Sequence, residues 1–350
     1  HKMGEIPVSQ ARSLYTTMIV DVYKELLTVQ SFLRSFFKTK ENASKYISIE
    51  VQRGLDLIAV DVVRGSKGNR NDFGLSTLKT ILPPYYREFF DGTDLDLFDR
   101  LFGTSGEIDS AIFAQFLTDV AEKYMILQNK IERAYEKQCA DVFNTGVLTL
   151  ADGSTIDFKR KTESMATVAT LWTAANSDPY EDLKTGAAFL KEKGKAVGST
   201  MNAICGGKAL AAFLDNTKVQ KRADIKNFGL DIVAQPQRNS VGASYHGRVA
   251  AGSFNIDLWS YPEVFTDANG STKQYIEEEK IIMLPEAPRS TMAYAAVPRL
   301  ISGVATQTRG AYVLSDYTDE ASSAHIFDIK SAGVAVPVAV DQIYTMKVVA

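Results

Sequence analysis

The sequence is poor in the side chains from which metal and redox sites are built. Among 350 residues there are two cysteines and three histidines. Cys139 and Cys205 lie far apart, which favours two buried thiols in a reducing compartment over a disulfide between them. His1, His246 and His325 have no second histidine or cysteine at a zinc-ligand spacing. The sequence therefore predicts no metal site.

Motifs that mark catalytic or nucleotide-binding sites are also missing. The chain has no Gly-x-Ser-x-Gly elbow, no His-Glu-x-x-His and no Gly-x-Gly-x-x-Gly. The nearest approach to a phosphate loop is Gly206-Gly207-Lys208, but Ala209 replaces the magnesium-binding Ser or Thr and Asn202 replaces the first glycine. We expect a helix start at this point, and a protein that is not an enzyme and needs no cofactor.

Neither a strong positive charge nor a long hydrophobic run is present. The formal net charge is −3, from 39 basic and 42 acidic residues. Proteins that grip phosphate backbones usually carry a basic domain or stripe. We therefore expect a chain that encloses nucleic acid, if it meets any, without sequence-specific binding. The sequence contains no apolar run of the roughly 18 residues that crossing a membrane requires, which predicts no membrane-spanning segment.

What is present is a mixture of strand and helix patterns, which predicts an α+β fold. Strict alternation over residues 46–52 is typical of a half-buried strand, and residues 57–63 and 73–82 continue it as a ribbon. The ribbon tip, residues 65–72, is polar and contains glycine. Because an isolated two-stranded ribbon is marginal in water, we expect it to lie on a surface that another subunit supplies.

A long helix is predicted over residues 107–143, which contain neither glycine nor proline. At 1.5 Å per residue it would be roughly 55 Å long. Its broad, aromatic apolar stripe favours a spine backed by a sheet over a coiled coil. Further along, Asp152-Gly153 predicts a hairpin, and Asp178 predicts the N-cap of a helix. Later strands are expected at three places. They are residues 253–265 and 273–284, joined by a turn, and residues 334–349.

Two groups of residues are candidates for contacts between subunits. A helical pattern over residues 13–37 ends in Phe32, Leu33, Phe36 and Phe37, which must be buried either in this chain's own core or against a neighbour. At the ribbon tip, Arg64, Lys67 and Arg70 form a basic patch. A contact with an acidic neighbour and a solvated loop are both open for this patch. Our mechanical expectation is that arm and ribbon both need an adjoining copy to hold their shape.

The order of these features resembles that in a known family. Residues 32–37 (Phe-Leu-Arg-Ser-Phe-Phe), the tip at residues 63–68, residues 178–183 (Asp-Pro-Tyr-Glu-Asp-Leu) and the final Val-Val-Ala are similar to the lambda-type major capsid proteins, the phage capsid protein E family. The resemblance covers most of the chain.

This resemblance implies the tailed-phage major capsid fold with five successive parts. They are an N-terminal arm (1–44), an extended β-ribbon loop (45–85), a peripheral domain with the spine helix (86–197), an axial domain (198–330) and a C-terminal strand that returns to the peripheral domain (331–350).

The function implied is that of the major capsid protein of a tailed double-stranded DNA bacteriophage. Such a chain would self-assemble into hexamers and pentamers of an icosahedral shell around the genome, in the host cytoplasm. Portal, scaffold and decoration proteins are the partners implied. An encapsulin-like compartment enclosing an enzyme cargo is the alternative, and the lambda-like arm and ribbon tip favour the phage protein.

Overall fold

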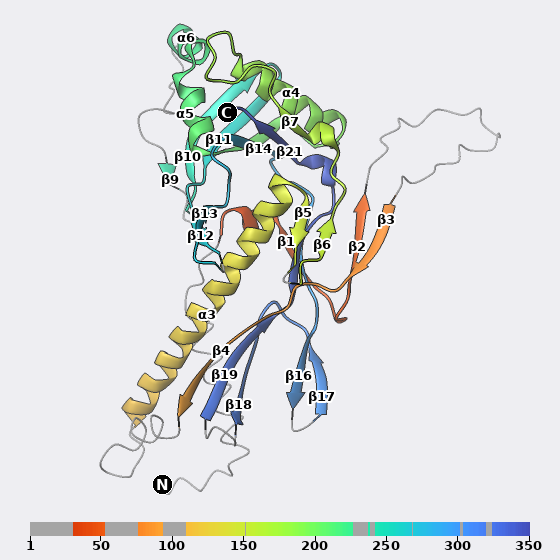
Figure 1. Cartoon of the computed structure of the whole chain (residues 1–350), viewed down its shortest axis with the longest axis vertical. Coiled ribbons are helices and arrows are strands. Elements are labelled where there is room, and N and C mark those ends of the chain that lie inside the picture. The colour runs from red at the N-terminus through yellow and green to blue at the C-terminus, as the bar shows by residue number, and fades with distance from the viewer. Residues whose placement is uncertain are drawn as a thin grey trace, which may run out of the picture.

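The computed structural model describes most of the chain. The described ranges are 31–52, 76–93, 110–150, 152–226, 237–238, 242–267, 269–301, 304–319 and 324–350. The molecule is elongated, with one long helix running from the lower sheets to an upper lobe (Figure 1). Predictions for residues 13–30 and 57–63, and for Arg64, Lys67 and Arg70, lie outside the described residues.

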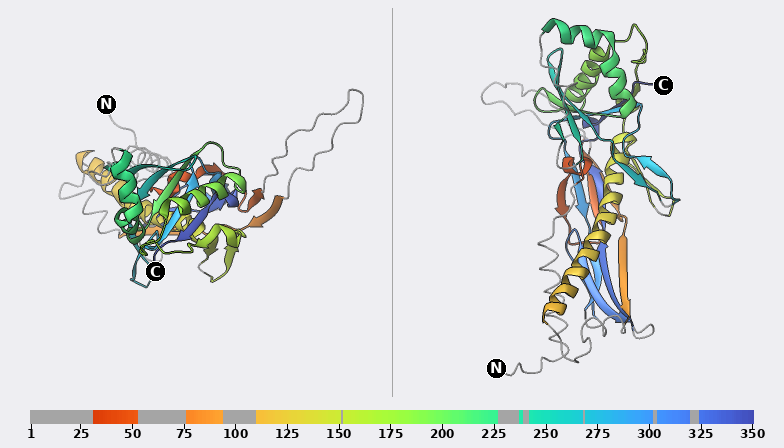
Figure 2. Two further views of the ribbon diagram at one scale, coloured as in Figure 1. Left: turned by 90° about the horizontal axis from the view of Figure 1, so that it is seen from above. Right: turned by 90° about the vertical axis from the view of Figure 1, so that its left-hand side faces the viewer.

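The long helix, α3 (Ser110–Asn144, 35 residues), packs along a sheet, as predicted for the spine. This sheet has the order β18 (Val313–Asp319), β19 (Ala324–Ser331), β4 (Tyr86–Thr93), and all its pairs are antiparallel. Aromatic rings join the two layers. The Tyr86 and Tyr135 ring centroids are 5.3 Å apart, and those of Phe90 and Tyr124 are 5.4 Å apart. Figure 2 shows the helix lying lengthwise beside the strands.

A seven-stranded sheet forms the centre of the upper lobe. Its order is β7 (Met165–Thr167), β21 (Tyr344–Lys347), β14 (Lys280–Pro285), β8 (Thr200–Cys205), β11 (Phe254–Ser260), β10 (Ser244–Ala251), β9 (Gln237–Arg238). The central strand β8 is buried from Met201 onward, as expected for a strand covered on both faces. It pairs in parallel with β11 and antiparallel with β14.

This sheet is the wall between two hydrophobic cores. Alternate residues of β8 point to opposite sides, so Ile204 joins the core around α3 while Met201 and Ala203 join the other. The helices α4 (Pro179–Glu192), α5 (Gly207–Asp215) and α6 (Thr217–Lys226) belong to the second core.

The remaining strands form small sheets and hairpins. One sheet has the order β1 (Lys38–Glu41), β15 (Ser290–Tyr294), β20 (Gly333–Pro337). The hairpins are β2 (Ile47–Gln52) with β3 (Ser76–Ile81), β5 (Val147–Thr149) with β6 (Thr155–Asp157), β12 (Val264–Thr266) with β13 (Thr272–Gln274), and β16 (Val297–Ile301) with β17 (Val304–Thr308). Three 3-10 helices complete the described elements: η1 (Leu33–Phe36), η2 (Thr162–Ser164) and η3 (Val340–Gln342).

Local signals placed several elements correctly, and three need correction. The two long strands β11 and β14 do not pair with each other, because β8 lies between them; only the short β12 and β13 form the predicted turn. The segment predicted as one strand at 334–349 is two strands, β20 and β21, in different sheets and separated by η3. The arm over residues 33–41 is a single 3-10 turn followed by a strand.

Two strand pairings join ranges that the sequence analysis assigned to different parts. The C-terminal strand β21 pairs with β14, inside the range predicted as axial. Conversely, β19, from the same predicted range, pairs with β4 from the range predicted as peripheral. The sequence order of the elements does not specify these long-range pairings.

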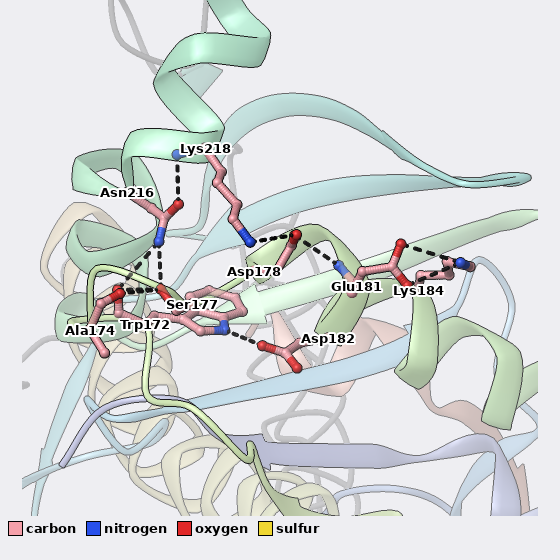
Figure 3. Close-up of polar contacts among 9 residues, drawn as sticks. All are labelled: Trp172, Ala174, Ser177, Asp178, Glu181, Asp182, Lys184, Asn216 and Lys218. Atoms are coloured by element: carbon pink, nitrogen blue, oxygen red, sulfur yellow. Dashed lines mark hydrogen bonds and ion pairs between the residues drawn. The ribbon is translucent and has the colours of Figure 1, made fainter.

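The start of α4 confirms the predicted cap and anchors the top of the lobe (Figure 3). The Asp178 carboxylate accepts a hydrogen bond from the Glu181 amide at 3.4 Å and forms an ion pair with Lys218 at 2.9 Å. Behind it, the indole of the buried Trp172 donates to Asp182 at 2.8 Å. These contacts tie α4 to the beginning of α6.

We predict that Asp178→Ala lowers the free energy of unfolding by about 1 kcal/mol, because the cap of α4 is lost. Asp178→Asn keeps a capping oxygen and loses only an exposed ion pair, so it should cost roughly 0.5 kcal/mol or less. Urea unfolding of the unassembled chain measures both. Equal losses in the two variants would contradict the capping role.

Candidate functional site: arm, ribbon and exposed sheet face

The arm residues singled out from the sequence pack on this chain's own core. Phe32, Leu33 and Phe37 are buried, and Phe36 is half-buried against the same core. The Phe37 ring lies 5.1 Å from that of Phe143 at the end of α3. Of the two alternatives for this cluster, packing in the chain's own core is the one that the described residues follow.

Two carboxylates of α3, one helical turn apart, hold the arm. Glu136 accepts hydrogen bonds from the backbone amides of Leu33 at 2.8 Å and Arg34 at 3.0 Å. The Arg34 guanidinium pairs with Glu132 at 2.6 Å, and the hydroxyl of Tyr312 donates to the same carboxylate. We call this group, Arg34 with Glu132 and Glu136, the arm clasp.

Burial gives the clasp an unusual protonation equilibrium. It raises the pKa of Glu136 from 4.5 to about 7, although hydrogen bonds from Leu33, Tyr261 and Arg34 act in the lowering direction. Sequence reasoning missed both glutamates, because a charged residue in an amphipathic helix is ordinarily assigned to the solvated face.

The ribbon behaves differently from the arm. Within the described residues, β2 and β3 pair with each other and with no third strand, and they point away from the body (Figure 2). Ile47 and Ile81 are buried at its base, while Tyr46 and Leu82 beside them are exposed. At its base, the ribbon is therefore joined to the core of its own chain through Ile47 and Ile81.

The β18–β19–β4 sheet has exposed side chains on the face opposite α3, beside the buried Val313, Ser315 and Asp328 of the same face. Arg87, Phe89 and Tyr317 point to this side, and Phe89 and Tyr317 remain 59% and 42% exposed. Arg87 pairs with the fully buried Asp328 at 2.9 Å and donates to the Tyr317 hydroxyl at 3.0 Å. The alternation of Tyr85, Arg87 and Phe89 in the sequence was the signal that could have revealed this face.

The two cysteines and the Gly206-Gly207-Lys208 segment have structural roles. Cys139 and Cys205 are buried free thiols, and burial raises the pKa of Cys205 to about 12. A Cβ at Gly206 would lie 2.2 Å from the Glu277 carbonyl oxygen, so the glycine permits a close backbone approach, and Lys208 pairs with Glu278 at 2.8 Å. The described part of the chain contains no cluster of metal-ligating side chains. None of its helices is long and apolar enough to cross a membrane.

The described structure thus combines a long spine helix, a projecting ribbon and a sheet face with exposed aromatic side chains. Two solved structures share the fold. One is described as a capsid protein of a prophage of E. coli CFT073, with a TM-score of 0.64, 16% identity and coverage of 97% of this chain and 99% of that one. The other is a phage-related protein from Bordetella bronchiseptica RB50, with a TM-score of 0.52, 12% identity and coverage of 95% and 96%.

The family follows from the sequence comparison. The model of phage major capsid protein E matches residues 16–348, so the chain belongs to that family. No curated protein matches it. Its role is therefore that of a phage major capsid protein, a structural subunit of the virion shell, and the resemblance noted in the sequence is confirmed.

Because Leu33 is fully buried in the isolated chain, Leu33→Ala should lower the free energy of unfolding of the unassembled protein by about 3 kcal/mol. Leu82→Ala, at a leucine that is 59% exposed, is the matched control and should change it by roughly 0.5 kcal/mol or less. Urea unfolding tests both. An unchanged stability for Leu33→Ala would mean that the arm packs only in the assembled shell.

Proposed function

We propose that this chain builds the icosahedral shell of a tailed double-stranded DNA phage, assembling as hexamers and pentamers in the host cytoplasm. The observation that carries the proposal is the ribbon, whose described strands leave the body and pair only with each other. A ribbon of this kind is stabilised when it lies on another surface. Contacts of one face with a different face close into rings when the rotation permits.

The exposed sheet face is the surface that fits the ribbon of an adjoining copy. Phe89 and Tyr317 offer apolar area that the chain itself does not cover, and Arg87 lies between them. Apolar area that is buried on association contributes about 25 cal/mol per Å², and this is the main favourable term. Arg64, Lys67 and Arg70 of the ribbon tip are proposed as further contact residues.

The axial part of the shell is assigned to the lobe with the seven-stranded sheet, and the peripheral part to α3 and its sheet. The weakly acidic chain, with a net charge of −3, suits a container, since tight phosphate binding would hinder packing and release of DNA. Portal, scaffold and decoration proteins are the further partners that membership of the family supports.

Expression of the full chain followed by negative-stain microscopy tests the shell. We expect closed particles that contain DNA or are empty. Particles that co-purify with a protein cargo would instead support the encapsulin-like alternative. A protein that stays monomeric at every salt and protein concentration would contradict both.

Phe89→Ser tests the docking surface. The side chain is mostly exposed in the single chain, so the substitution should change the free energy of unfolding by roughly 0.5 kcal/mol or less. Loss of the buried aromatic contact should reduce shell formation at least tenfold, as measured by sedimentation and microscopy. Phe89→Tyr keeps the ring and should assemble. Normal assembly of Phe89→Ser would show that this face is not used.

A further inference from the structure

We propose that the arm clasp is gated by a proton: a neutral Glu136 keeps the arm closed on the spine, and ionisation of Glu136 loosens it. The proposal goes beyond the shell-forming role. It rests on the proposed function only for its consequence in assembly, because the clasp lies within a single chain.

The geometry places more negative than positive charge in the clasp. The carboxylates of Glu132 and Glu136 lie one turn apart on α3, and both are 9% exposed or less. A single guanidinium, that of Arg34, serves them, and its bonds go to Glu132 at 2.6 and 2.8 Å. Rings of Tyr135 and Tyr294 lie 5.7 and 5.6 Å from the guanidinium carbon and fix it there. With both carboxylates ionised, one negative charge is buried without a cationic partner, which is costly.

The other groups around Glu136 do not relieve this charge. The titratable and charged groups that face the two carboxylates are Arg34 from the arm, Glu132 and Cys139 from α3, Tyr261 and Tyr275 beside β12 and β13, Tyr294 from β15 and Tyr312 before β18. Burial raises the pKa of Cys139 and of the four tyrosines, so these groups stay neutral near pH 7. The unpaired negative charge can therefore be removed in two ways: Glu136 takes up a proton, or the arm moves away and exposes the carboxylate to water.

Neutral Glu136 can keep its place in the clasp. One oxygen still accepts from the Leu33 amide, and the protonated oxygen can donate to the Tyr261 hydroxyl, which already interacts with this carboxyl. The proton therefore removes the charge of the site and keeps the bond from the Leu33 amide, while the protonated oxygen accepts the bond from the Arg34 amide less strongly.

The sign of the pH dependence follows from linkage. In the closed clasp burial raises the pKa of Glu136 to about 7, whereas a solvated glutamate has its ordinary value of 4.5. Closure therefore takes up a proton between these two values. The contribution of this group to closure is fully present below pH 4.5, falls as the pH rises, and is lost above about pH 7. Within the window, the ratio of open to closed arm rises by at most about tenfold per pH unit.

Hydrogen exchange of the Leu33 and Arg34 amides, the two donors to Glu136, measures the clasp directly in the full, unassembled chain. We expect their protection, corrected for intrinsic exchange, to fall at least tenfold between pH 5 and pH 8. Glu136→Gln is neutral at every pH, so protection should be independent of pH and, at pH 8, higher than in the native chain. Glu122→Gln, an exposed position on the same helix, is the matched control and should keep the native slope.

If Glu136→Gln does not fold, trypsin cleavage after Arg34 in the native chain serves instead, normalised to cleavage of an unstructured peptide at each pH. Faster normalised cleavage from pH 5 to pH 8 supports the clasp. A flat native profile, or an unchanged slope in Glu136→Gln, overturns it. Shell formation is scored separately by microscopy. Shells without a pH slope refute only the clasp, whereas a pH slope without shells refutes only the proposed function.

Discussion

The arrangement around the spine depends on the hydrogen bonds that polar side chains on the buried face of α3 make with other parts of the chain. Glu136 binds the arm backbone, Gln138 accepts from the Ala335 amide at 3.1 Å and donates to the Tyr86 hydroxyl at 2.9 Å, and Asn144 donates to the Tyr275 carbonyl at 3.1 Å. Buried polar groups must be paired, and each of these pairs exists in one register only. The spine therefore does more than supply apolar area: it fixes the positions of strands and turns that come from distant parts of the chain.

This dependence explains which parts of the fold the sequence could predict. The spine, the Asp152-Gly153 hairpin and the Asp178 cap rest on residues within a few positions of one another, and all three are present. Patterns of this kind report local backbone preference and the presence of a buried face. They carry no information on which surface covers that face.

Long-range pairings escaped the same reasoning for a physical reason. The sequence of β8 predicts a buried strand but does not specify its neighbours. Its position between β11 and β14 therefore could not be predicted. The clasp was hidden in the same way. Glu132 and Arg34 are 98 residues apart, and a glutamate in an amphipathic helix gives no sign that it is buried. The contact surface fared no better, since Phe89 and its neighbour Phe90 point to opposite sides of β4.

The arm and the ribbon also differ from each other, although the sequence analysis expected both to depend on an adjoining copy. From Phe32 onward, the arm forms its hydrogen bonds and buries its apolar side chains within its own chain. The position of this part of the arm is therefore fixed in the single subunit. The ribbon strands pair with no third strand within the described residues, and Phe89 and Tyr317 of the sheet face stay exposed. A subunit that must occupy slightly different positions around a closed shell benefits from this division. Under the proposed roles, α3 and its sheet keep one geometry, the ribbon accommodates differences between neighbours, and the proton on Glu136 adjusts the arm.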